Sequence, residues 1–206
     1  MKEYIQKRWK TYWNTKGWFS KITDLLFVFL VIGMIIPASR KEISAFMAGL
    51  MASSPKTIES DAQQTLTDEA WDWQLVDMKG QLVSLGQYKG QTILLNFWAT
   101  WCPPCIAEMP DIQALYDGFS DKAVFLLVSD EKPALINEFA QKKGYNMPFY
   151  QQAGTTPPEF STNSIPTTWI INPEGKIVIR KTGAAKWNSE SMQKLISSYY
   201  KSKADF

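Results

Sequence analysis

The chain has 206 residues, of which 45% are apolar and 14% aromatic, so it can form one or two folded domains and is not a disordered protein. Its net charge of +2 is unevenly spread, because the first 24 residues carry six basic and two acidic side chains while the rest is slightly acidic. Histidine is absent, which excludes Cys/His zinc sites, His-based catalytic triads and c-type haem attachment; the charge pattern indicates no nucleic-acid surface.

The N-terminal part predicts a membrane anchor. Residues 1–21 form a basic cytoplasmic arm, and residues 22–39 contain an uncharged run of fifteen residues from Leu25 to Ser39. As a helix this run extends about 22 Å, and flanking residues or bilayer thinning can cover the shortfall from a core of about 30 Å. Because basic residues precede the run, the N-terminus should stay in the cytoplasm and the remainder should be exported. A cleaved signal peptide and a buried soluble helix are the alternatives, although no convincing cleavage site follows.

Residues 40–68 are predicted to be a membrane-proximal segment and a tether, since the composition turns polar after residue 53. The predicted globular domain covers residues 69–206. Its expected elements are a hairpin at 71–88, a central strand at 92–99, a helix at 103–118, a strand at 123–129, a helix at 133–143, a hairpin at 166–181 and a closing helix at 189–200. This order predicts an α/β fold with a mixed central sheet, helices on both faces and an N-terminal β-hairpin.

The two cysteines, Cys102 and Cys105, lie where the central strand gives way to the following helix. Cys102 is the predicted N-cap and Pro103 takes the first helical position. Backbone donors and the helix dipole stabilise a thiolate there, so Cys102 is the predicted nucleophile and Cys105 the resolving thiol. Pro104 lacks an N–H, which predicts a less stabilised thiolate and a weaker oxidant. A disulfide across two residues constrains little of the unfolded chain, and two cysteines rarely hold zinc, so a structural bridge or a metal site explains the pair poorly.

Glu108 follows Cys105 by three residues, so the helix places both side chains on one face. An acid on the inner face should have a raised pKa and could accept the proton of the Cys105 thiol. A partly solvated helix residue is the alternative interpretation.

A proline opens the strand that follows Ile165. A cis bond between Ile165 and Pro166 would turn the Ile165 backbone towards the thiols, where an extended substrate could pair with it. A proline that simply starts a strand is an equally good interpretation.

Together, NFWATWCPPC at residues 96–105 and SIPTTWIINPEGKIV at residues 164–178 resemble the thioredoxin superfamily, specifically its membrane-anchored TlpA/ResA-like branch. The resemblance covers residues 71–200. It implies a redox-active disulfide between Cys102 and Cys105, with Glu108 as the acid near the thiols, since Asn96 stands where typical thioredoxins have a buried acid. The residues that it implies for shaping the site and binding substrate are Trp101, Pro103, Pro104, Ile165, Pro166 and Thr167.

The resemblance further implies a single-pass protein of the bacterial inner membrane whose periplasmic, or otherwise extracytoplasmic, domain is a thiol-disulfide oxidoreductase. Its substrates would be protein disulfides, with apocytochrome c as a candidate, and a membrane electron donor of the DsbD/CcdA kind would restore the dithiol. No cofactor is expected. A peroxiredoxin-like thiol peroxidase and a non-catalytic thioredoxin-like binding module are the alternatives. The first is disfavoured because no proline stands at the distance upstream of Cys102 that the P-x-x-x-T-x-x-C pattern requires. The second is disfavoured because a binding module would need neither thiol.

Overall fold

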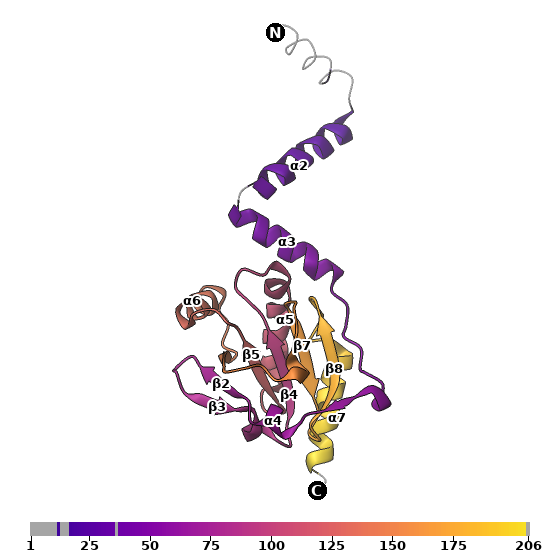
Figure 1. Cartoon of the computed structure of the whole chain (residues 1–206). Helices are drawn as coiled ribbons and strands as arrows, with labels where there is room; N and C mark the ends of the chain where they lie inside the picture. The colour runs from indigo at the N-terminus through magenta and orange to yellow at the C-terminus, as the bar shows by residue number, and fades with distance from the viewer. Residues whose placement is uncertain (1–11, 13–16, 36, 205–206) are drawn as a thin grey trace. The chain divides into compact units, whose positions relative to one another are not determined.

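The computed structural model describes residues 12, 17–35 and 37–204 (Figure 1). The chain divides into two compact units, Met1–Ile43 and Ser44–Phe206. The predicted basic arm at residues 1–21 lies mostly outside the described residues.

Two helices cover the described part of residues 22–39, the segment predicted to span the membrane: α2 (Trp18–Ile35) and α3 (Pro37–Met51). Helix α2 carries Lys21 and Asp24 in its first two turns. Among the described residues, no helix has both the length and the apolar character needed to cross a membrane.

A mixed eight-stranded sheet lies at the centre of the second unit, in the order β1-β8-β7-β4-β5-β6-β2-β3. The predicted central strand is β4, which pairs parallel with β5 and antiparallel with β7. Both predicted hairpins, β2–β3 and β7–β8, are present. The strands are β1 (Gln64–Thr65), β2 (Gln74–Asp77), β3 (Leu82–Ser84), β4 (Thr92–Phe97), β5 (Ala123–Val128), β6 (Phe149–Ala153), β7 (Thr167–Ile171) and β8 (Lys176–Thr182).

The three long helices of this unit contribute to one apolar cluster. They are α5 (Pro103–Phe119), α6 (Pro133–Lys143) and α7 (Glu190–Ala204). The steps β4–α5–β5 and β5–α6–β6 run in the same direction across parallel strands, so right-handed connections place α5 and α6 on the same face. Among the helices, only short ones contribute to the other apolar cluster. They are α4 (Asp68–Trp71) and the 3₁₀ turns η2 (Leu85–Tyr88) and η3 (Pro158–Phe160). A further 3₁₀ turn, η1, covers Ser60–Ala62.

Residues 53–66, here called the strap, run along the outer side of β8. The backbone N–H of Lys186 donates to Ser53 (3.1 Å), that of Ile58 to Val178 (2.7 Å), and β1 within the strap pairs antiparallel with β8. The predicted domain start at residue 69 therefore falls inside the compact unit, because the predicted tether is bonded to the sheet.

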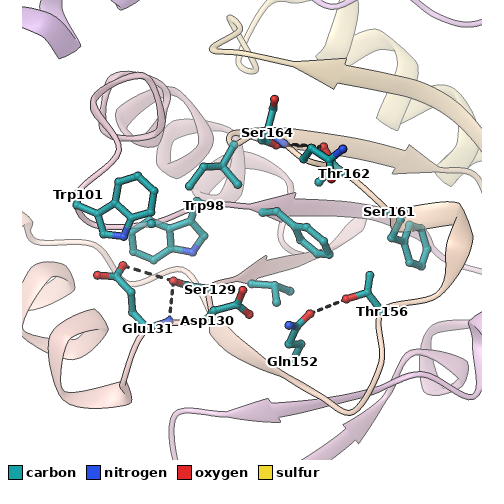
Figure 2. A pocket seen from close by; sticks show the side chains of 16 residues that line it. Trp98, Trp101, Ser129, Asp130, Glu131, Gln152, Thr156, Ser161, Thr162 and Ser164 are labelled. Atoms are coloured by element: carbon teal, nitrogen blue, oxygen red, sulfur yellow. Dashed lines mark hydrogen bonds between the residues drawn. The ribbon is translucent and has the colours of Figure 1, made fainter.

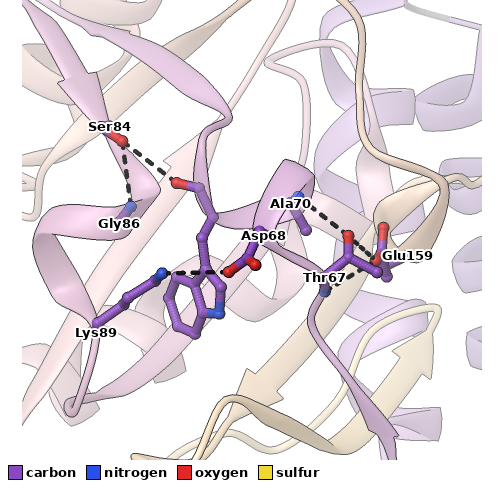
Figure 3. A network of polar contacts seen from close by, with 8 residues as sticks. Thr67, Asp68, Ala70, Ser84, Gly86, Lys89 and Glu159 are labelled. Atoms are coloured by element: carbon purple, nitrogen blue, oxygen red, sulfur yellow. Dashed lines mark hydrogen bonds and ion pairs between the residues drawn. The ribbon is translucent and has the colours of Figure 1, made fainter.

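A polar network joins the end of the strap to the loop around η3 (Figure 3). Thr67 caps α4 by accepting from the Ala70 N–H (3.2 Å), and its own hydroxyl donates to Glu159 on η3 (2.8 Å). Ser84 donates to the Trp71 carbonyl at the other end of α4 (3.3 Å). These bonds anchor the chain just before the segment that leads to Ile165 and Pro166.

Candidate active site

Cys102 and Cys105 form a disulfide at the start of α5, with their Cα atoms 5.3 Å apart. Cys102 is the N-cap, and its Sγ accepts from the backbone N–H of Cys105 at 3.3 Å. Pro103 occupies the first helical position, as the sequence predicted, and Pro104 offers no N–H to the sulfur. The helix N-terminus therefore stabilises negative charge on Cys102 with one fewer backbone donor than a non-proline helix start would supply.

The two cysteines differ in their access to solvent. Cys105 is fully buried, Cys102 retains 3% of its surface, and the adjacent Trp101 is 59% exposed. An attacking or attacked sulfur from another molecule can therefore reach Cys102 but not Cys105. Pro103 and Pro104 are half-buried around this opening.

The peptide bond between Ile165 and Pro166 is cis. The carbonyl oxygen of Ile165 lies 3.7 Å from Sγ of Cys102, so the Ile165 backbone does face the disulfide. The sulfur carries no proton in the oxidised form; a thiol at this position could donate to the carbonyl. The downstream segment thus forms one side of the site.

Thr167 has a structural place in this segment. Its side chain is fully buried, and its hydroxyl donates to the Ser164 carbonyl (2.6 Å) and lies 3.3 Å from that of Thr182. It therefore shapes the loop beside Cys102, and its side chain is not accessible to a substrate.

Glu108 lies on the inner face of α5, 2% exposed. Its carboxylate accepts from Asn96 Nδ2 (2.9 Å), the Ala185 N–H (3.1 Å) and Trp187 Nε1 (2.8 Å). Burial raises the pKa of Glu108 to about 7, even though these hydrogen bonds favour the ionised form. No hydrogen bond joins this carboxylate to either sulfur in the described part of the oxidised chain. A group that titrates near neutral pH is therefore held on the same helix face as Cys105.

Glu131 is a residue that the sequence analysis missed. Its carboxylate accepts two hydrogen bonds from Thr100, one from the backbone N–H (2.6 Å) and one from the hydroxyl (2.7 Å). Glu131 follows β5, and Thr100 follows β4 in the turn that leads to Cys102. Because parallel strands end at the same edge of a sheet, an acid just after β5 was the signal that could have placed it near the thiols. The two bonds fix the turn that carries Trp101.

A groove of about 460 Å³ adjoins the disulfide (Figure 2). Three segments line it: residues 97–101 before the disulfide, residues 128–131 after β5, and the loop of residues 152–165 that ends at Ile165. Trp101 and Ile165 belong to both the groove and the surroundings of the disulfide. The groove therefore ends beside Cys102, the less buried of the two cysteines. Within the described residues, no cluster of cysteines and acids is arranged to hold a metal ion.

A model of the AhpC/TSA family matches residues 66–180, which is more than half of the chain. The chain belongs to the AhpC/TSA family. Its relatives within this family include the thiol-disulfide oxidoreductase ResA of Halalkalibacterium halodurans, 32% identical over 119 residues that make up 56% of this chain and 68% of the relative. ResA of Bacillus cereus is 31% identical over 118 residues, which again make up 56% of this chain and 68% of the relative.

Solved structures show the same fold as this AhpC/TSA protein. A thiol:disulfide interchange protein of the thioredoxin family from Chlorobium tepidum has a TM-score of 0.50 and 20% identity, covering 72% of this chain and 97% of that one. A DsbF homologue from Corynebacterium diphtheriae has a TM-score of 0.53 and 18% identity, covering 71% and 99%. The protein is a thioredoxin-like thiol-disulfide oxidoreductase, as the resemblance implied.

Proposed function

We propose that the protein reduces disulfide bonds in extracytoplasmic polypeptides through a dithiol–disulfide cycle of Cys102 and Cys105. The Cys102 thiolate attacks one sulfur of the substrate disulfide, and the other substrate sulfur leaves as a thiolate that takes up a proton. Cys105 then attacks the Cys102 sulfur of the mixed disulfide and releases the second substrate thiol. Two electrons pass from the protein dithiol to the substrate, and the protein ends with its own disulfide.

One observation carries this proposal: Cys102 caps α5 and keeps 3% of its surface exposed, whereas Cys105 is fully buried. The capping sulfur is the one whose thiolate the helix stabilises, and it is also the one that a substrate can touch. The buried sulfur is bonded to it and can react only with whatever Cys102 holds. The two cysteines are thus divided into an attacking and a resolving thiol.

Glu108 is the group that we propose accepts the proton of Cys105 before resolution. Its pKa of about 7 lets it change protonation state near neutral pH, which suits a proton acceptor. The carboxylate is kept from rotating by three donors on two segments of the chain, β4 and the loop between β8 and α7. Glu108 therefore combines a fixed position with a suitable pKa.

The compartment, the electron donor and the substrate follow from the likeness to ResA and remain part of the proposal. We place the second unit outside the cytoplasm, attached to the membrane through the N-terminal segment. A membrane carrier of the DsbD/CcdA kind supplies the two electrons as a dithiol. Apocytochrome c, whose haem-attachment segment contains two cysteines, is the substrate we propose.

The test is to trap the mixed disulfide. In Cys105→Ser, the complex between Cys102 and its substrate cannot be resolved and should accumulate in intact cells as a reducible adduct. Cys102→Ser is the matched control and should form no adduct. Adducts that contain apocytochromes c would support the proposed substrate. Adducts with other exported proteins would support disulfide reduction in general and contradict apocytochrome c as the substrate. Absence of adducts in Cys105→Ser would overturn the mechanism.

The two alternatives predict other results. A thiol peroxidase would oxidise Cys102 with hydrogen peroxide far faster than free cysteine reacts, yet Leu95 and Ala99 occupy the proline and threonine positions of the peroxidase pattern. A binding module would keep its biological activity in Cys102→Ser.

Membrane attachment is checked by fractionating cells that express the full chain or a chain lacking residues 1–43.

A further inference from the structure

The lining of the groove beside the disulfide carries acidic but no basic side chains. Its sixteen lining residues include two acids, Asp130 and Glu131, and no lysine or arginine. Half-buried Phe97 and exposed Trp101 give it accessible aromatic surface, here called the aromatic floor, and the remaining wall is mostly hydroxyl and amide side chains. A segment that enters it meets negative charge and aromatic surface within reach of Cys102.

The two acids are not equivalent. Both oxygens of Glu131 accept hydrogen bonds from Thr100, at 2.6 and 2.7 Å. The Glu131 carboxylate is therefore already hydrogen-bonded to the turn before the disulfide. The side chain of Asp130 is exposed and has no hydrogen bond or ion pair with any residue in the described part of the chain (Figure 2). Among the described side chains of the second unit, none pairs with Asp130.

The neighbouring basic side chains do not occupy this position. Arg180 approaches the far side of the groove, but its guanidinium donates to the Ser161 carbonyl (2.9 Å) and lies over the Trp169 ring (5.9 Å). Lys132 follows in sequence, but it is exposed and does not line the groove. The Asp130 carboxylate is therefore open to a cation from another molecule.

We propose that the groove selects substrate polypeptides that carry a lysine or arginine next to their reactive disulfide. The cationic head pairs with Asp130, and the aliphatic stem lies on the aromatic floor, as long basic side chains do on apolar surfaces. The inference rests on the proposed function, because the segment must enter while its disulfide reacts at Cys102. It adds a charge preference that the thiol chemistry does not require.

The experiment compares two synthetic peptides with one internal disulfide each, identical except for lysine or glutamine beside a cysteine. Reduced full-length protein is mixed with each peptide, and tryptophan fluorescence gives the second-order rate of disulfide reduction. We expect the lysine peptide to react about twofold to fivefold faster, as for an exposed ion pair, and the preference to fade at high salt. In Asp130→Asn the preference should disappear.

Asp121→Asn is the matched control, since Asp121 is also exposed but precedes β5, whereas Asp130 follows it. It should keep the preference for the lysine peptide. The ratio between peptides cancels any change in the reactivity of Cys102 itself. Equal rates for the two peptides, or a preference that survives in Asp130→Asn, would overturn the inference alone. A protein that reduces neither peptide would overturn the proposed function as well.

Discussion

The buried carboxyl of Glu108 should make the oxidised protein less stable as the pH rises. Burial raises its pKa from 4.5 to about 7, so in the unfolded chain the proton leaves near 4.5 and in the folded chain it leaves near 7. Between these values the folded state binds more protons, and the free energy of unfolding therefore falls with increasing pH. A shift of this size corresponds to about 3 kcal/mol, lost progressively across that window.

Glu108→Gln should remove this pH dependence. The glutamine oxygen can accept from Ala185 and Trp187 in place of the carboxylate oxygen, and its amide can donate to Asn96 if the Asn96 side chain turns. Oδ1 of Asn96 has no partner among the described residues, and after the turn the Thr168 hydroxyl, which now accepts from Nδ2 (2.7 Å), would donate to Oδ1. Near pH 4.5 Glu108 is protonated in the folded state and only half ionised in the unfolded chain, so we expect variant and wild type to agree within about 1 kcal/mol. By pH 8 the variant should be the more stable by about 3 kcal/mol.

Urea unfolding of the oxidised proteins, followed by tryptophan fluorescence from pH 4.5 to 8.5, measures this difference. Keeping the disulfide closed removes the titration of the two thiols. Glu138→Gln changes an exposed acid on α6 and should follow the wild type at every pH. If the difference between wild type and Glu108→Gln stays constant over this range, Glu108 does not titrate as its burial requires, and the argument for its role near the thiols loses its basis.

Three further predictions concern the same region. In Pro104→Ala the new N–H can donate to the Cys102 thiolate. A charge-assisted hydrogen bond of about 1.5–3 kcal/mol should raise the reduction potential by about 30–60 mV. Equilibrium with glutathione measures the potential, and an unchanged or more negative value would contradict the reasoning. Glu131→Gln loses one of the two acceptors that hold the turn before the disulfide, so urea unfolding should show a loss of about 1–2 kcal/mol, and unaltered stability would rule out a tight clamp. Trp187→Phe removes a donor to the carboxylate of Glu108, so the pKa of Glu108 should rise above about 7. Carbon NMR of the labelled carboxyl measures this pKa, and a lower value would refute the assigned contact.

Local patterns were sufficient for the elements that carry the thiols. The β-rich run before the cysteines predicted β4, and a cysteine followed by proline predicted the N-cap of α5. The three-residue spacing placed Glu108 on the face of Cys105, and burial then accounts for its raised pKa. Each of these inferences depends on neighbours in sequence, so tertiary context had little chance to override it.

The features that were missed depend on residues far apart in the chain. Glu131 contacts Thr100 only because β4 and β5 are adjacent and parallel, which the sequence does not state. The position of α6 on the same face as α5 depends on the order of β4, β5 and β6 across the sheet. The strap looked like a tether because its polar residues lack periodicity, although its backbone pairs with β8. Such backbone pairing leaves little trace in side-chain pattern.

The strap also decides where an extended polypeptide can attach to this sheet. A bare β8 would expose a row of unpaired backbone groups, to which an unfolded chain could add as an extra strand. With residues of the strap already bonded along β8, that competing attachment is closed. Under the proposed mechanism, an incoming chain would then pair with the loop at Ile165, whose carbonyl oxygen lies 3.7 Å from Sγ of Cys102.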